Sequence, residues 1–224
     1  MFDRIAPRYD FLNRALSARF DVSWRRRMEK YLPQRPSLDV LDLATGTGDQ
    51  IIFLAERVPA IRSGVGIDLA EKMLEIGRGK IAAKGLSGRV DLRTGDALKV
   101  PCSDASFDAT TMSFGIRNVL DVDLCLREML RVLRPGGRSM ILECSVPSWQ
   151  PLRALYLFYF RHILPRLAGL ISGDGSAYRY LNQTVETFPQ GEAFCALMEK
   201  AGFKNVTCHR LTGGIASLYV GDKT

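Results

Sequence analysis

Between residues 38 and 144 the chain alternates short apolar runs with helical patterns, and this alternation limits the fold more than any other feature. The apolar runs predict strands at residues 38–44, 64–69, 89–94, 107–113 and 139–144. Apolar residues at helical spacing predict helices at 51–58, 70–84 and 126–133, although Gly77 and Gly79 weaken the second of these. A series of strand–helix units is typical of an α/β fold, in which helices cover both faces of a parallel sheet.

The segments on either side of this core differ from it, and all of them together are expected to form one domain of 224 residues. Residues 1–36 have a basic, helical pattern and are expected to cap the core, which spans residues 37–146. Residues 147–190 are rich in aromatic residues and prolines and are expected to form a lid over a substrate. Residues 191–224 predict a helix and then two strands around Gly213-Gly214.

A glycine loop, Ala44-Thr45-Gly46-Thr47-Gly48, follows the first predicted strand. Ligands of such sheets bind beyond the carboxyl ends of the strands, so the loop marks a binding site. The loop lacks the Gly-Lys-Ser/Thr of a P-loop, and the third residue after Gly48 is Ile51 where a dinucleotide fingerprint has glycine. Neither phosphate motif is therefore present.

Four carboxylates lie near the predicted strand ends: Asp42, Asp49, Asp68 and Asp96. A pyrophosphate beside them would be repelled, since two like charges ~4 Å apart cost on the order of 4 kcal/mol near a protein surface. S-adenosylmethionine has no phosphate and carries a sulfonium and an ammonium group, so it suits an acidic loop. Asp68 is spaced to hold the ribose hydroxyls. The alternative is that the aspartates, Asp49 above all, only form loops and cap helices.

Several segments resemble known proteins. VLDLATGTG (40–48), GIDLAEKML (66–74), GDALKVP (95–101) and EMLRVLRPGG (128–137) resemble class I S-adenosylmethionine-dependent methyltransferases. MFDRIAPRYDFLN (1–13), SFGIRNV (113–119), residues 141–170 and YRYLNQTVETFP (178–189) resemble more specifically the quinone C-methyltransferases of menaquinone and ubiquinone synthesis. The resemblance implies a Rossmann-like fold with a mostly parallel seven-stranded sheet and an antiparallel C-terminal hairpin. It also implies C-methylation of a polyprenylated hydroquinone, either demethylmenaquinol or 2-methoxy-6-polyprenyl-benzoquinol.

The same resemblance assigns roles to individual residues. It implies that Thr47 contacts the cofactor, that Asp68 holds the ribose and that Ser113 borders the cofactor. Many relatives have Asn where this chain has Asp96, and an ionised Asp can accept a hydrogen bond but cannot donate one. The full set of expected cofactor-binding residues is Asp42, Gly46, Thr47, Gly48, Asp68, Leu69, Asp96, Ala97 and Ser113.

Arg117, Asn118 and Tyr9 match the residues that the resemblance associates with catalysis. A ring carbon is a poor nucleophile until an adjacent phenol loses its proton. Arginine keeps its proton above pH ~12, so we expect Arg117 to stabilise the phenolate rather than to act as a base. We expect Asn118 to orient the ring or a water molecule. The alternative for Arg117 is a surface or helix-capping cation.

Residues 154–160 (ALYLFYF) are all apolar or aromatic, and Arg153, Arg161 and Arg166 prevent a membrane-spanning run. They are expected either to contact a prenyl tail at the membrane surface or to pack on the sheet. The expected partner is a membrane-resident prenylated quinol, and a homodimer or a quinone-biosynthesis complex stays open. A cytoplasmic location, or its organellar equivalent, is expected, and the net charge of +7 allows contact with an anionic membrane at its inner face.

Three other functions stay open. An RNA methyltransferase is suggested by the basic charge and by Pro101-Cys102, but the acidic turn that follows argues against it, so no nucleic-acid partner is expected. A protein that binds S-adenosylmethionine without catalysis is the second. The third is an O-methyltransferase that uses His162, His209 or a metal as its base or activator. The five cysteines have no CxxC spacing, so no metal site is expected. Their odd, scattered pattern predicts a reducing compartment.

Overall fold

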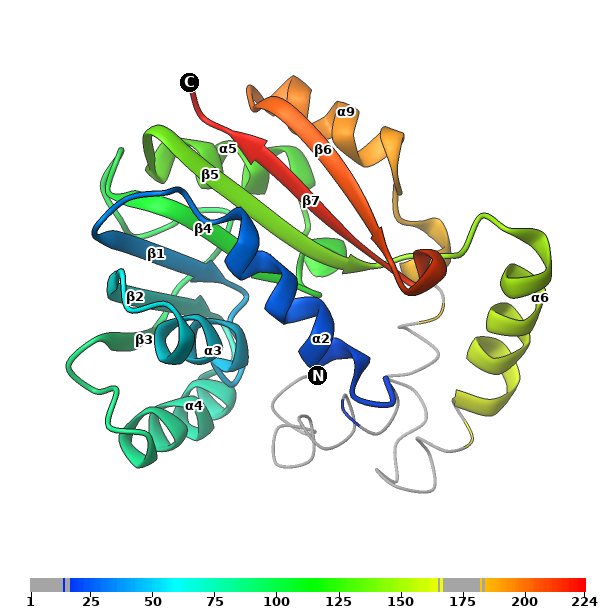
Figure 1. The fold of residues 1–224 in the computed structure, drawn as a ribbon, viewed down its shortest axis with the longest axis horizontal. Coiled ribbons are helices and arrows are strands. Elements are labelled where there is room, and N and C mark those ends of the chain that lie inside the picture. Colours follow the sequence, from blue (N-terminus) through cyan, green and yellow to red (C-terminus); the bar gives the residue numbers. More distant parts are fainter. Residues whose placement is uncertain (1–13, 15–16, 165, 167–181, 183) are drawn as a thin grey trace.

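A computed structural model describes residues 14, 17–164, 166, 182 and 184–224. Its centre is a seven-stranded sheet in the order β3-β2-β1-β4-β5-β7-β6 (Figure 1). β1 to β5 run parallel, and β7 runs antiparallel to both of its neighbours, β5 and β6. The strands are β1 (Leu38–Leu43), β2 (Ile61–Asp68), β3 (Val90–Thr94), β4 (Phe107–Ser113), β5 (Leu133–Cys144), β6 (Lys204–Leu211) and β7 (Ala216–Asp222). The expected sheet and its antiparallel hairpin are confirmed.

Helices follow the strands as the periodicity predicted. The α-helices are α2 (Phe20–Arg27), α3 (Asp49–Arg57), α4 (Glu71–Ala83), α5 (Val122–Val132), α6 (Gln150–Phe158) and α9 (Glu192–Ala201). Short helical turns are η1 (Met28–Tyr31), η2 (Ile116–Asn118), η3 (Tyr159–Ile163) and η4 (Thr212–Gly214). α5 begins earlier than predicted because the Asp121 side chain caps it by accepting a hydrogen bond from the Leu124 backbone N–H (2.9 Å).

Alternate residues of the central strands face opposite layers of helices. Val40 and Met140 belong to a buried cluster formed with α2, α3 and α4. Leu41 and Ile141, their neighbours in sequence, belong to a second cluster formed with α5 and α9. Helices therefore cover both faces of the sheet (Figure 1).

Gly77 in α4 has a packing role that its low helix propensity conceals. A Cβ atom at Gly77 would lie 2.4 Å from Leu92 Cδ1 and 3.0 Å from the backbone C and O of Thr47. The missing side chain thus lets α4 approach β3 and the glycine loop. A Cβ atom at Gly79, two residues further along α4, would meet nothing within 4 Å.

The two flanking segments are described only in part. In the N-terminal segment Trp24, Met28 and Leu32 are buried against the sheet. In residues 147–190, α6 and η3 form a small cluster of Tyr156 and Phe160 to one side of the sheet (Figure 1). Residues 1–13 and 167–181 lie outside the described residues, and so does Tyr9. None of the helices described is long and apolar enough to cross a membrane.

Candidate cofactor and substrate site

A cleft lies beyond the carboxyl ends of β1, β2, β3 and β4. β1 has β2 on one side and β4 on the other, so the order in which successive strands are added to the sheet reverses here. Open α/β sheets bind their ligands at such a point. The lining residues come from the four loops that follow these strands. They include Ala44, Gly46, Asp68, Leu69, Ala70, Asp96, Ala97, Leu98, Ser113, Phe114, Gly115 and Asn118.

Asp68 joins two of these loops. Its Oδ2 accepts a hydrogen bond from the Gly46 backbone N–H (2.8 Å), and its Oδ1 accepts one from the Ala70 backbone N–H (2.9 Å). The carboxylate is therefore held in place at the cleft, and its remaining lone pairs can accept hydrogen bonds from a pair of hydroxyls. This geometry suits the expected ribose-binding role.

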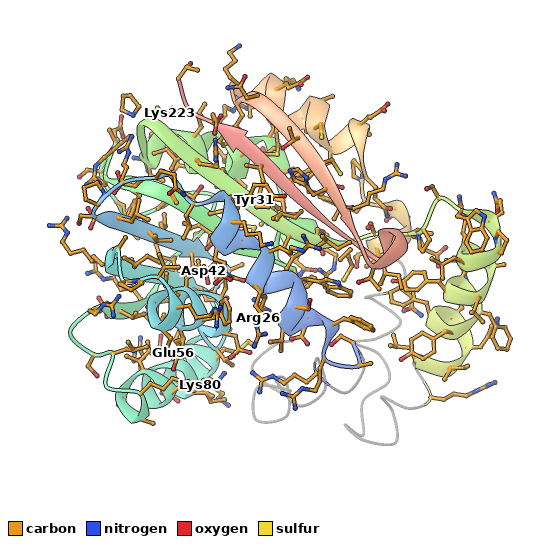
Figure 2. All side chains as sticks on the ribbon, in the orientation of Figure 1. Arg26, Tyr31, Asp42, Glu56, Lys80 and Lys223 are labelled. Atoms are coloured by element: carbon orange, nitrogen blue, oxygen red, sulfur yellow. The ribbon has the colours of Figure 1, made fainter. Side chains whose placement is uncertain are left out.

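Asp42 lies beneath the cleft rather than in its wall. The residue is 1% exposed, and its two oxygens accept hydrogen bonds from the hydroxyls of Thr45 and Thr111 (2.6 Å each). Burial raises the pKa of Asp42 to about 6. Figure 2 shows Asp42 in the interior, at the end of β1. Asp42 can therefore attract a cationic ligand electrostatically, although its side chain does not line the cleft.

Asp49 is not an unpaired carboxylate, as the sequence suggested, but forms two ion pairs. Lys80 Nζ lies 2.7 Å from Asp49 Oδ1, and Arg14 Nη2 lies 3.0 Å from Oδ2. Burial acts to raise the pKa of Asp49, but Lys80 and the neighbouring arginines outweigh it, so the pKa is lowered. Lys80 of α4 also donates a hydrogen bond to the Thr47 hydroxyl oxygen (2.9 Å), which holds this hydroxyl against α4. The acidic character of the site therefore comes mainly from Asp42, Asp68 and Asp96.

Asp96, Ala97 and Leu69 all line the cleft, and the family resemblance places Asp96 and Ala97 against the adenine. Asp96 Oδ1 accepts a hydrogen bond from the Leu98 backbone N–H (2.8 Å), which fixes the turn after β3. The Leu69 side chain is 69% exposed and offers an apolar surface to a flat ring. Asp96 can accept a hydrogen bond from an exocyclic amino group.

At the end of β4 the backbone is strained. Phe114 has φ of +60°, a conformation that costs free energy for any residue with a side chain. Its carbonyl oxygen accepts hydrogen bonds from Arg117 Nη1 (2.7 Å) and Asn118 Nδ2 (3.4 Å). The Asn118 Oδ1 atom is buried and has no hydrogen-bond partner. This unsatisfied acceptor belongs to a residue that lines the cleft, which makes a ligand hydroxyl a candidate partner for it.

Arg117 is paired with a buried acid. Its Nη1 lies 2.5 Å from Glu143 Oε1, and the two side chains are 10% and 2% exposed. Glu143 also accepts a hydrogen bond from the Cys144 backbone N–H (2.7 Å). The alternative in which Arg117 is a surface cation is therefore wrong, because its side chain is only 10% exposed. Sequence reasoning missed Glu143, although an acid inside the apolar run 139–144 was a usable signal.

The predicted site residues fall into three groups. Gly46, Asp68, Leu69, Asp96, Ala97, Ser113 and Asn118 line the cleft. Asp42, Thr47, Gly48 and Arg117 lie directly beneath or behind it. Tyr9 lies outside the described residues, so its role stays a prediction. The lining suits S-adenosylmethionine, because it offers a carboxylate for the ribose, acidic groups for a cation and an unpartnered buried acceptor beside them.

The strand order and the strand-end cleft together define a class I S-adenosylmethionine-dependent methyltransferase fold. A solved structure, a putative S-adenosyl-L-methionine-dependent methyltransferase from Methanococcus maripaludis, superposes with a TM-score of 0.70. It is 20% identical, and the match covers 100% of this chain and 94% of that one, which supports the fold alone.

Sequence similarity is more specific. The chain belongs to the ubiE/COQ5 methyltransferase family, whose model matches residues 1–223. It is 48% identical to the ubiquinone/menaquinone biosynthesis C-methyltransferase UbiE of Geotalea daltonii, over 100% of this chain and 94% of the relative. It is 47% identical to the demethylmenaquinone methyltransferase of Thermus thermophilus, over the full length of both chains. The family resemblance read from the motifs is confirmed.

Proposed function

We propose that this protein transfers a methyl group from S-adenosylmethionine to a ring carbon of a prenylated hydroquinone. The observation that carries the proposal is the match of the whole chain to relatives named for quinone-biosynthetic methylation, at 47–48% identity. The two names differ in scope, so both demethylmenaquinol and 2-methoxy-6-polyprenyl-benzoquinol are candidate acceptors. The strand-end cleft and its acidic groups support the cofactor.

S-adenosylmethionine supplies the methyl group as an electrophile. On the protein side, Asp68 is in place to hold the ribose, and Asp96 and Ala97 to contact the adenine. Asp42 supplies negative charge from below and so favours a positively charged ligand. Binding by these groups fixes the position of the donor relative to the end of β4, and such positioning can contribute about 7 kcal/mol to catalysis.

Arg117 and Asn118 are positioned for the acceptor. The buried Asn118 Oδ1 can accept a hydrogen bond from a ring hydroxyl and so orient the ring. Arg117, fixed by Glu143 and by the Phe114 carbonyl, can donate to the oxygen as it loses its proton. Because Glu143 compensates its charge, we expect Arg117 to act through a directed hydrogen bond more than through net charge. Overall, the ring carbon exchanges its hydrogen for a methyl group and one proton is released.

We also propose that the outer face of α6 rests on the membrane from which the substrate comes. Trp149, Leu155 and Phe158 are 67%, 66% and 57% exposed. Exposed aromatic and aliphatic side chains of this size favour the interface of a bilayer. Arg161 lies beyond them on η3, where it pairs with Glu186.

The test is incubation with S-adenosylmethionine labelled in its methyl group, with each demethylated quinol supplied in detergent. The expected product carries the label on a ring carbon, located by mass spectrometry and NMR. Label on an oxygen would favour the O-methyltransferase alternative. Cofactor binding by calorimetry without any labelled product would favour the non-catalytic alternative.

A further inference from the structure

Arg25 on α2 has a buried nitrogen that no protein group satisfies. Its Nε atom is buried without a hydrogen-bond partner, and within the described part of the chain Arg25 forms no ion pair. Its guanidinium carbon lies 5.3 Å from the centre of the Phe114 ring, a residue that lines the cleft. Arg25 as a whole is partly exposed, but its buried and unsatisfied Nε beside a ligand cleft points to an anionic partner that comes with the ligand.

Gln50 provides a second unsatisfied donor in the same region. It is the second residue of α3, directly after the glycine loop, and it is 1% exposed. Its Oε1 accepts a hydrogen bond from the hydroxyl of Ser113 (3.2 Å), another lining residue. Its Nε2 is buried and has no partner. Gln50 and Arg25 therefore each contact one of two adjacent lining residues, Ser113 and Phe114.

The charges around the cleft explain why such donors are needed. The acidic groups favour the sulfonium and the ammonium of S-adenosylmethionine, but they repel its carboxylate. Lys80 is engaged with Asp49 and Thr47, and Arg117 with Glu143 and the Phe114 carbonyl. Arg25 is close enough to lower the pKa of both Asp42 and Asp49, so its charge acts on the glycine loop.

We propose that Arg25 and Gln50 bind the carboxylate of the methionine half of S-adenosylmethionine. A guanidinium can donate from two nitrogens to a carboxylate, and the Gln50 amide adds a neutral donor. The contact also joins α2 to the cofactor, so the N-terminal cap forms one wall of the cofactor site. This assignment rests on the cofactor of the proposed function.

The test compares two ligands that differ by the carboxylate alone, S-adenosylmethionine and its decarboxylated form. Isothermal titration is carried out with the full chain and no quinol. Arg25→Gln is expected to weaken S-adenosylmethionine binding about 10- to 100-fold, as expected for hydrogen bonds to a charged group, and to leave the decarboxylated ligand within about twofold. Gln50→Leu is expected to weaken the first ligand about threefold to tenfold and to spare the second.

Arg26, labelled in Figure 2, is the matched control, because it is the next residue of α2 and is exposed. Its guanidinium lies over the Phe53 ring. Arg26→Gln is expected to change neither affinity. Equal weakening of both ligands by Arg25→Gln would mean that Arg25 only offsets the aspartates, and would overturn the assignment. So would unchanged affinity for both. If Arg25→Gln does not fold, Arg25→Lys and Gln50→Leu decide between the same outcomes. A wild-type chain that binds no S-adenosylmethionine would instead refute the proposed function.

Discussion

The buried pair of Arg117 and Glu143 gives the prediction that separates catalysis from folding most clearly. Arg117→Met removes the cation and leaves Glu143, which is 2% exposed, without its ion-pair partner. Removing one partner of a buried pair typically costs about 3–5 kcal/mol of stability. Glu143 keeps the hydrogen bond from the Cys144 backbone N–H, so we expect a loss near the lower end, about 3 kcal/mol.

The double variant Arg117→Met/Glu143→Gln removes both charges. It is expected to recover most of the lost stability, since no uncompensated charge remains buried. It is not expected to recover activity, because the donor to the acceptor oxygen is still missing. Loss of one such donor typically lowers kcat by about 10²–10³-fold.

Urea unfolding at pH 7 gives the free energy of unfolding, and turnover with saturating S-adenosylmethionine gives kcat for each variant. Calorimetric titration of the cofactor shows whether the variant site still binds it. A loss of less than about 1 kcal/mol in Arg117→Met would show that the pair is not buried as described. Normal turnover of the double variant would refute the role of the guanidinium.

Three further predictions concern pH, packing and the membrane. Burial raises the pKa of Asp42 from 3.8 to about 6, so its ionisation opposes folding and its contribution to stability should fall by up to ~3 kcal/mol as pH rises from about 4 to above 6. Carboxylates with lowered pKa values, such as Asp49, act in the opposite direction, so the test is a difference: in urea unfolding across this range the wild type should lose stability relative to Asp42→Asn, and parallel profiles would contradict the burial argument. In α4, Gly79→Ala should raise the free energy of unfolding by about 0.5–1 kcal/mol, whereas Gly77→Ala should lower it by about 1–3 kcal/mol because its Cβ overlaps Leu92. Equal effects in the two variants would show that α4 does not pack closely there. Leu155→Asp should reduce flotation with anionic liposomes at low salt; a wild type that does not float would remove the membrane proposal.

The order of strands and helices could be predicted because its signals are local. Apolar runs, helical spacing and the glycine loop each lie within a few residues of sequence, and the structure confirms all five strands predicted between residues 38 and 144. The placement of Asp68 beside the glycine loop also followed, because the carboxyl ends of neighbouring parallel strands meet at one edge of the sheet.

The charge partners could not be predicted in the same way. Lys80 pairs with Asp49 across 31 residues, and Arg117 pairs with Glu143 across 26. Single-sequence periodicity contains no information on which side chains meet at such separations. The unpaired negative charge near the glycine loop was therefore overestimated, and the pairing of Arg117 with Glu143 was not predicted.

Gly77 shows the same limit for packing. Its local effect is a helix penalty of about 1 kcal/mol relative to alanine, which made the helix at 70–84 less certain. Its benefit is the close approach of α4 to Leu92 and Thr47, and this contact exists only in the folded chain. Helix propensity thus predicts the destabilising effect of Gly77 but not the close packing that requires a glycine there.

A crystal structure with S-adenosylhomocysteine, the product that remains after methyl transfer, would decide most directly where the donor sits. We predict both ribose hydroxyls on the Asp68 carboxylate, the adenine beside Ala97 and the amino-acid end toward Arg25. A nucleoside bound at any other edge of the sheet, or an Asp68 side chain turned away from its sugar, would contradict the account.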